Sequence, residues 1–143
     1  ARHALLEQMG LSLDSPFEGA GFATLGEAMI APTRIYVAPV LAALKAHSES
    51  ISAMAHITGG GLVDNLPRVL PEGLVAEVDY GCWPEPAIFD LIRSAGVEEA
   101  EMRRTFNLGI GYVLLVRPDA LEALTSTLAE EGESPIVIGR VGS

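Results

Sequence analysis

Apolar residues in the first half of the chain follow two different periods. Residues 37–47 have four apolar side chains at i, i+3, i+4 and i+7, on one face of a helix: Val37, Val40, Leu41 and Leu44. Residues 51–57 and, more regularly, residues 74–79 alternate between two faces, which is the period of a β-strand. The pattern predicts one helix followed by two strands.

The second half of the chain continues this alternation of element types. Residues 84–96 form a predicted helix between two prolines and a glycine, and residues 97–103 a short acidic helix. Residues 108–116 are almost continuously apolar, as in a central strand that is covered on both faces. A helix over 118–132 and a last strand over 136–141 complete the pattern, which is typical of an α/β or α+β fold with helices packed against a sheet.

The first 29 residues contain less regular patterns. The chain starts within a helical pattern that has no N-cap residue before it and ends at Gly10, so we expect the sequence to be cut from a longer protein. Residues 10–24 are rich in turn-forming residues and are predicted to be an irregular loop. A short helical turn is predicted for residues 25–29.

Length and charge exclude several kinds of protein. The 143 residues suit one domain, 1–143, and the 49% hydrophobic content is enough for a core. A net charge of −10 argues against a nucleic-acid partner, and no apolar run approaches the ~20 residues of a membrane span. Cys82 is the only cysteine, which excludes an internal disulfide and favours a reducing, cytoplasmic location without a thiolate metal site.

The segment with most chemical information is residues 55–68, AHITGGGLVDNLPR. A strand leads into three glycines whose backbone amides can approach a ligand, and a helix start behind them favours a phosphate. Asn65 can add amide hydrogen bonds and Arg68 a charged fork. The Lys-Ser/Thr pair of a phosphate-binding P-loop is missing, so a tight turn that serves packing alone remains an alternative.

Two further features are candidates for the same site. His56 is the best titratable group, although a strand histidine is also compatible with a hydrogen-bonded structural role. Thr105 and Asn107 precede the apolar strand, where Gly109 and Gly111 leave room for a ligand or for another backbone. From periodicity alone, close packing explains this second segment equally well.

Five segments, in order along the chain, resemble the phosphoribosylformylglycinamidine cyclo-ligase (aminoimidazole ribonucleotide synthetase) family. Residues 31–37 resemble its PTRIYV segment, and residues 55–70 resemble AHITGGGLxxNxPRVL. Residues 83–89 resemble WPxPxIF, residues 101–111 resemble EMxRTFNxGIG, and residues 138–139 resemble the IG of its last strand. The resemblance covers nearly the whole chain from about residue 28 onward.

The resemblance implies both a fold and a reaction. The expected fold is the layered α/β/α C-terminal domain of this family, with a mixed sheet and a distant likeness to ferredoxin. The expected activity is a ligase of purine biosynthesis that uses ATP and Mg²⁺ to close the imidazole ring of formylglycinamidine ribonucleotide. The resemblance also implies a cytoplasmic homodimer, in which an N-terminal domain absent from this chain binds most of the ATP and contributes most of the dimer contact.

The same resemblance assigns residues to a groove between the two domains. His56 is expected to be catalytic, as a polar or acid/base group near the substrate amidine. The expected substrate-binding residues are Thr58, Gly59, Gly60, Gly61, Asn65, Arg68, Thr105 and Asn107. No metal ligand is expected in this chain, and we expect the chain alone to be inactive.

Two other interpretations remain open from the sequence. One is a domain of a sister ATP-binding enzyme, such as formylglycinamidine synthetase, selenophosphate synthetase or thiamine phosphate kinase. Those enzymes share the glycine-rich turn only loosely and are not expected to match all the segments together. The other is a non-catalytic module for ligand binding or assembly.

Overall fold

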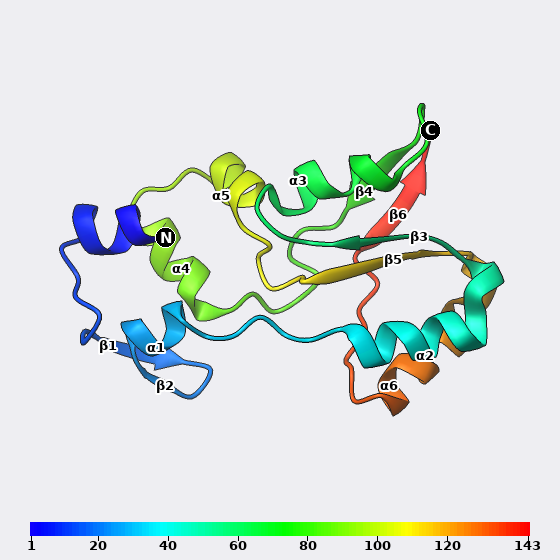
Figure 1. The fold of residues 1–143 in the computed structure, drawn as a ribbon. Helices are drawn as coiled ribbons and strands as arrows, with labels where there is room; N and C mark the ends of the chain where they lie inside the picture. The colour runs from blue at the N-terminus through cyan, green and yellow to red at the C-terminus, as the bar shows by residue number, and fades with distance from the viewer.

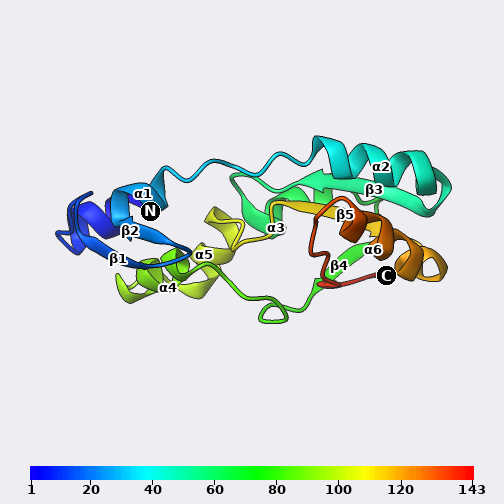
Figure 2. The same cartoon turned by 90° about the horizontal axis from the view of Figure 1, so that it is seen from below.

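The computed structural model describes residues 1–143, which form an elongated molecule with two neighbouring groups of elements (Figures 1 and 2). One group contains the π-helix η1 (His3–Gln8), β1 (Pro16–Gly19), β2 (Phe22–Thr24), α1 (Leu25–Met29) and α4 (Ala87–Ser94). The other contains α2 (Val37–His47), β3 (Ile51–His56), β4 (Val75–Val78), β5 (Tyr112–Val116), α6 (Leu121–Glu130) and β6 (Gly139–Gly142). The short helices α3 (Gly61–Asn65) and α5 (Glu99–Thr105) lie near the junction. Three 3-10 turns, η2 (Ser48–Ser50), η3 (Pro67–Val69) and η4 (Pro118–Ala120), complete the chain.

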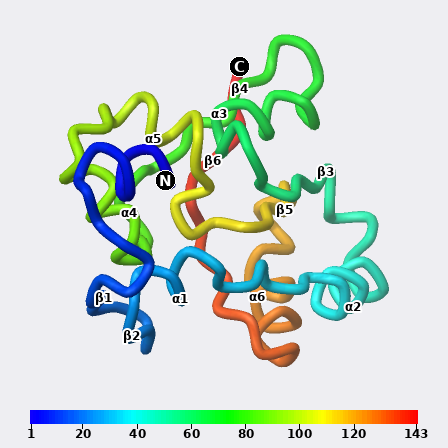
Figure 3. Tube along the Cα trace, turned by 60° about the vertical axis from the view of Figure 1, so that its left-hand side comes forward, coloured from blue at the N-terminus to red at the C-terminus, as the bar shows by residue number.

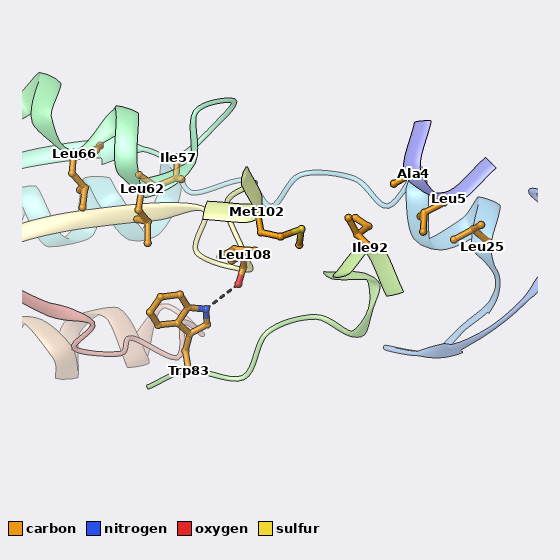
Figure 4. Packing of buried hydrophobic residues seen from close by; sticks show 11 residues of the cluster. Ala4, Leu5, Leu25, Ile57, Leu62, Leu66, Trp83, Ile92, Met102 and Leu108 are labelled. Atoms are coloured by element: carbon orange, nitrogen blue, oxygen red, sulfur yellow. Dashed lines mark hydrogen bonds between the residues drawn. The ribbon is translucent and has the colours of Figure 1, made fainter. Parts of the chain in front are cut away.

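A single hydrophobic core of eleven buried residues connects the two groups. Figure 4 shows this core running from Leu66 and Leu62 at one end, past Leu108 and Met102, to Ile92 and Leu25 at the other. The buried indole of Trp83 donates a hydrogen bond from Nε1 to the backbone oxygen of Leu108 at 2.9 Å, which joins the segment before α4 to the segment before β5. The two groups therefore share one interior.

The strands form three two-stranded sheets, β1–β2, β3–β5 and β4–β6, and every pair is antiparallel. The predicted α+β class is confirmed, but the predicted mixed sheet is wrong because the chain contains no parallel pair. Residues 108–116 were predicted to be a central strand, whereas β5 has a ladder partner on one edge only and its residues are half-buried. The strand begins at Tyr112 because Leu108 and Gly109 have φ of +51° and +97°, which is a turn and not an extended strand.

The prediction of an irregular loop over residues 10–24 is confirmed for residues 10–15 and wrong for residues 16–24. The segment contains the hairpin β1–β2, in which Gly19 pairs with Phe22 across a two-residue loop. Ala20 and Gly21 have φ of +51° and +80°, and positive φ at both loop positions matches the twist of paired strands. Turn-forming residues thus closed a hairpin here. The predicted helical turn that follows is confirmed as α1, where Thr24 and Glu27 form a capping box.

Helices α2 and α6 lie side by side on one side of the β3–β5 ladder, while α3 and β4 lie on the other (Figures 1 and 3). The predicted helix over residues 37–47 is confirmed with the same bounds. His47 Nε2 lies 2.8 Å from the Thr127 hydroxyl, which joins the two helices near the end of α2. An extended segment, residues 30–36, leads from α1 to α2 and brings Tyr36 to the end of the ladder (Figure 2).

Candidate functional site

The glycine-rich bend connects the end of β3 to the start of α3. Gly60 and Gly61 have φ of +100° and +58°, and the Gly61 amide donates a hydrogen bond to the Thr58 oxygen at 3.1 Å. A Cβ on Gly61 would overlap the Arg103 carbonyl oxygen and would lie 2.6 Å from that of Phe106. Gly61 is therefore required for packing against the end of α5, as the structural alternative predicted.

The first part of the bend is open instead. Thr58 and Gly59 are exposed, and a Cβ on Gly59 would meet no atom within 4 Å. The amides of Thr58, Gly59 and Gly60 donate to no acceptor of the chain. Because backbone amides require a partner, these three groups are available to water or to a ligand. The bend thus combines a packed glycine with an open stretch of unpaired donors.

Asn65 supports the bend from inside. Its side chain is buried, and Nδ2 donates to the oxygens of Gly61 at 2.7 Å and Gly59 at 3.3 Å. The side-chain NH2 group of Asn65 thus donates two hydrogen bonds within the chain, and it stabilises the bend through the backbone carbonyl groups of Gly59 and Gly61. Helix α3 has only five residues, so its dipole adds little to the attraction for an anion, and the backbone amides are the main donors.

His56 is exposed at the end of β3, opposite Tyr112 of β5 in the ladder. Its imidazole lies 5.9 Å from the Tyr112 ring in a stacked arrangement and 6.1 Å from the Tyr36 ring in an edge-on arrangement. Neither ring nitrogen forms a hydrogen bond within the chain. By contrast, His3 bonds Glu7 at 2.8 Å, and His47 bonds a hydroxyl of α6. The predicted alternative of a hydrogen-bonded structural histidine does not describe His56.

The remaining candidates occupy two other segments. Thr105 donates from Oγ1 to Glu101 Oε1 at 2.6 Å, and the Asn107 side-chain oxygen accepts from the Gly109 amide at 3.1 Å. Both residues belong to the segment whose carbonyl oxygens pack against Gly61, and their side chains stabilise α5 and the following turn. Arg68 lies in η3 beyond α3, is exposed, and forms no ion pair. His56, Thr58 and Gly59 are therefore exposed within one short segment, while Arg68 is exposed in η3.

Sequence reasoning missed two tyrosines of the site, Tyr36 and Tyr112, whose rings lie 5.5 Å apart. Burial raises the pKa of the Tyr36 phenol, the cation of Arg34 acts against this shift, and Glu133 adds to it. Tyr112 could have been found only from the ladder register, which a single sequence does not reveal. Tyr36 lies within the PTRIYV segment, but nothing local to that segment indicates its neighbour.

The chain supplies no evident metal centre. No group of three or more His, Cys, Asp or Glu side chains is arranged to hold a metal ion. None of the helices is both long and apolar enough to cross a membrane.

Fold and site together define an α+β domain with an open glycine-rich bend beside an unbonded histidine. The family model for "AIR synthase related protein, C-terminal domain" matches residues 4–143, and the chain belongs to this family. The family resemblance of the sequence motifs is thereby confirmed.

Among curated proteins, similar relatives are named phosphoribosylformylglycinamidine cyclo-ligase. The chain is 49% identical to that of Bacillus velezensis over 142 residues, covering 98% of this chain and 40% of the relative. It is 49% identical to that of Bacillus subtilis, with the same coverage, and 46% identical to that of Sorangium cellulosum, covering 100% of this chain and 41% of the relative. The chain thus spans about 40% of the length of the curated relatives that it matches.

Proposed function

We propose that residues 1–143 are the C-terminal domain of a phosphoribosylformylglycinamidine cyclo-ligase. The complete enzyme would close the imidazole ring of formylglycinamidine ribonucleotide to give aminoimidazole ribonucleotide, a step of purine biosynthesis that uses ATP. The identity of 46–49% to proteins of that name supports this assignment. The observation that carries it is the open bend, where unpaired amides lie beside the exposed imidazole of His56.

The amides of Thr58, Gly59 and Gly60 are suited to bind phosphate oxygens. They supply hydrogen-bond donors without a side chain above Gly59, so an anion can approach the backbone directly. The chain has nine Lys and Arg against nineteen Asp and Glu, so general attraction of anions is weak and local donors must provide the binding. We assign the bend to a phosphate group of the substrates.

His56 is suited to proton transfer during ring closure. In the reaction implied by the family resemblance, ATP phosphorylates the formyl amide oxygen. A nitrogen of the substrate then attacks the carbon that carries the phosphorylated oxygen. The new C–N bond forms as the C–O bond to phosphate breaks, and the attacking nitrogen loses a proton. An imidazole with a free ring nitrogen can accept that proton.

The rest of the enzyme would supply what this chain lacks. We assign the binding of ATP and Mg²⁺ mainly to the part of the protein outside this chain, together with most of a homodimer contact. The groove between that part and the bend would enclose the ribonucleotide. The cytoplasm is the proposed location.

A histidine substitution in the full-length enzyme tests the proposal. His56→Ala should lower kcat by about 100-fold or more, because general acid–base groups contribute at least that factor. The thermal unfolding midpoint should stay within a few degrees of the parent value, since the side chain is exposed and unbonded. ADP release and product formation measure the activity, and a thermal scan measures the folding.

His3→Ala is the matched control, because His3 is exposed on η1 and is bonded only to Glu7. This variant should retain the parent activity. Full activity of His56→Ala would remove the catalytic assignment.

A further inference from the structure

The imidazole of His56 lies against two aromatic rings and forms no hydrogen bond within the chain. Tyr112 stacks on it with 28° between the ring planes, and Tyr36 meets it edge-on at 65°. The two tyrosine rings also contact each other, so the three rings form a closed set of neighbours. We call Tyr36, His56 and Tyr112 the aromatic triad. Such edge-on and offset arrangements are the favoured geometries of aromatic pairs.

Each tyrosine of the triad is fixed by a separate part of the fold. Tyr112 is the ladder partner of His56, so the register of β3 and β5 sets its position. The Tyr36 hydroxyl lies directly against the Cα of Gly111, where a Cβ would overlap it. The chain just before Tyr36 is anchored by Arg34, whose Nη2 donates to the Gly132 oxygen at 3.2 Å and forms an ion pair with Glu133 at 3.1 Å. The rings are therefore positioned by three elements that are distant in sequence.

We propose that Tyr36 and Tyr112 are positioning residues that orient the His56 imidazole toward the substrate while leaving both of its nitrogens free. This proposal rests on the proposed function of His56. Catalytic histidines are commonly oriented by a hydrogen bond to one ring nitrogen, which leaves only the other for the substrate. Here ring contacts replace that bond. The rotational freedom of an exposed side chain is thereby reduced without the use of either nitrogen.

A ring-retaining and a ring-removing substitution of Tyr112 separate the contributions of ring and hydroxyl. In the full-length enzyme, Tyr112→Phe should keep kcat within about 2-fold, whereas Tyr112→Leu should lower it by roughly 10-fold, as expected for a misplaced catalytic group. KM should change much less than kcat, because the tyrosine rings orient His56 and are not assigned to substrate binding. Equal losses in the Phe and Leu variants would overturn the proposal, since the hydroxyl would then be responsible.

The pair Tyr36→Phe and Tyr36→Leu repeats the test outside the β-ladder, so the proposal remains testable if the Tyr112→Leu protein does not fold. Tyr80→Leu is the matched control. Tyr80 packs against Trp83 and Arg103 and forms no ring pair with a member of the triad, so Tyr80→Leu should lower stability but leave kcat unchanged.

A double-mutant cycle tests whether the tyrosines act through His56. In a His56→Ala background, Tyr112→Leu should have no further effect on kcat, because the group it positions is gone. An equal loss of kcat in both backgrounds would overturn the positioning role. If His56→Ala is inactive while both Leu variants are fully active, only this inference fails. If His56→Ala is fully active, the catalytic assignment of His56 fails, and this inference is overturned with it.

Nuclear magnetic resonance provides a readout that is independent of activity. The Cε1–H resonance of His56 should carry ring-current shifts from both tyrosines in the parent and in the Phe variants. It should move toward the value of a solvent-exposed histidine in the Leu variants. An unchanged resonance in Tyr112→Leu would contradict the stacked arrangement as the source of orientation.

Discussion

At the scale of single residues, neighbouring glycines of the bend perform different tasks. Gly61 is buried under two carbonyl oxygens and has positive φ, whereas Gly59 is exposed and has free space above it. The sequence motif alone offered packing and ligand contact as alternatives. The structure assigns packing to Gly61 and leaves the surface of Gly59 accessible.

Alanine substitutions should therefore have unequal effects on stability. Gly61→Ala should reduce the free energy of unfolding by about 3 kcal/mol, because a Cβ overlaps the backbone and an L-residue is strained at φ +58°. Gly59→Ala, the matched control, should stay within about 0.5 kcal/mol of the parent protein. Urea unfolding measures both values. Similar losses for the two variants would contradict the difference in packing.

Residue chemistry was predictable where it depends on neighbours in sequence. The bend and His56 could be found because glycines directly after a strand have a local physical meaning. The sequence did not reveal that the Asn65 side chain points into the bend, since its hydrogen bonds to Gly59 and Gly61 depend on the geometry of the turn. The aromatic triad depends on the pairing of residues 56 and 112, which only the folded ladder specifies.

At the scale of elements, Arg93 joins α4 to the segment before it and to α5 through ion pairs. Its guanidinium donates to Glu85 at 2.6 Å, Asp90 at 3.1 Å and Glu99 at 2.9 Å. The hydrogen bond from Arg93 lowers the pKa of the Glu99 carboxyl below its ordinary value. A lowered folded-state pKa contributes stability above the ordinary pKa of Glu, and this contribution is lost as the pH falls through the lowered value.

Arg93→Gln should lower the free energy of unfolding at pH 7 by about 1–2 kcal/mol, because the contact with Glu85 is partly buried. The difference from the parent should shrink as the pH falls from about 4, near the ordinary pKa of Glu, through the lowered pKa of Glu99 in the parent protein. Arg117→Gln, which breaks an exposed pair with Asp119, should have little effect at either pH. Thermal scans at pH 7 and pH 3 measure these differences, and a constant difference would contradict the linkage.

Element boundaries were predictable where periodicity is strong and local. The helix over residues 37–47 has the predicted bounds, but its buried residues are Pro39 and Ala43, and Val37 and Leu41 of the predicted apolar face are exposed. The apolar run over residues 108–116 is misleading, since its first four residues lie outside the strand and Leu108 is buried in a turn at positive φ. The β1–β2 hairpin was missed because its loop, Ala20-Gly21, lacks the Asn-Gly or Asp-Gly signal of such turns.

At the scale of the whole molecule, the chain corresponds to about 40% of the length of its relatives. With ATP, Mg²⁺ and formylglycinamidine ribonucleotide, this chain alone should release ADP only at the background rate, because the proposed groove would be completed by the rest of the enzyme. A full-length relative serves as the positive control. Turnover by the isolated chain near that of the relative would contradict the proposed division of the site.

The single tryptophan has a practical consequence for such experiments. Trp83 is 5% exposed, and its indole is bonded to Leu108, one residue after Asn107. Its fluorescence emission therefore originates from one known position, next to a segment of the candidate site. Opening of that segment would hydrate the indole and shift the emission to longer wavelength. The protein thus contains an intrinsic optical reporter, and conformational changes near the bend can be followed without an attached label.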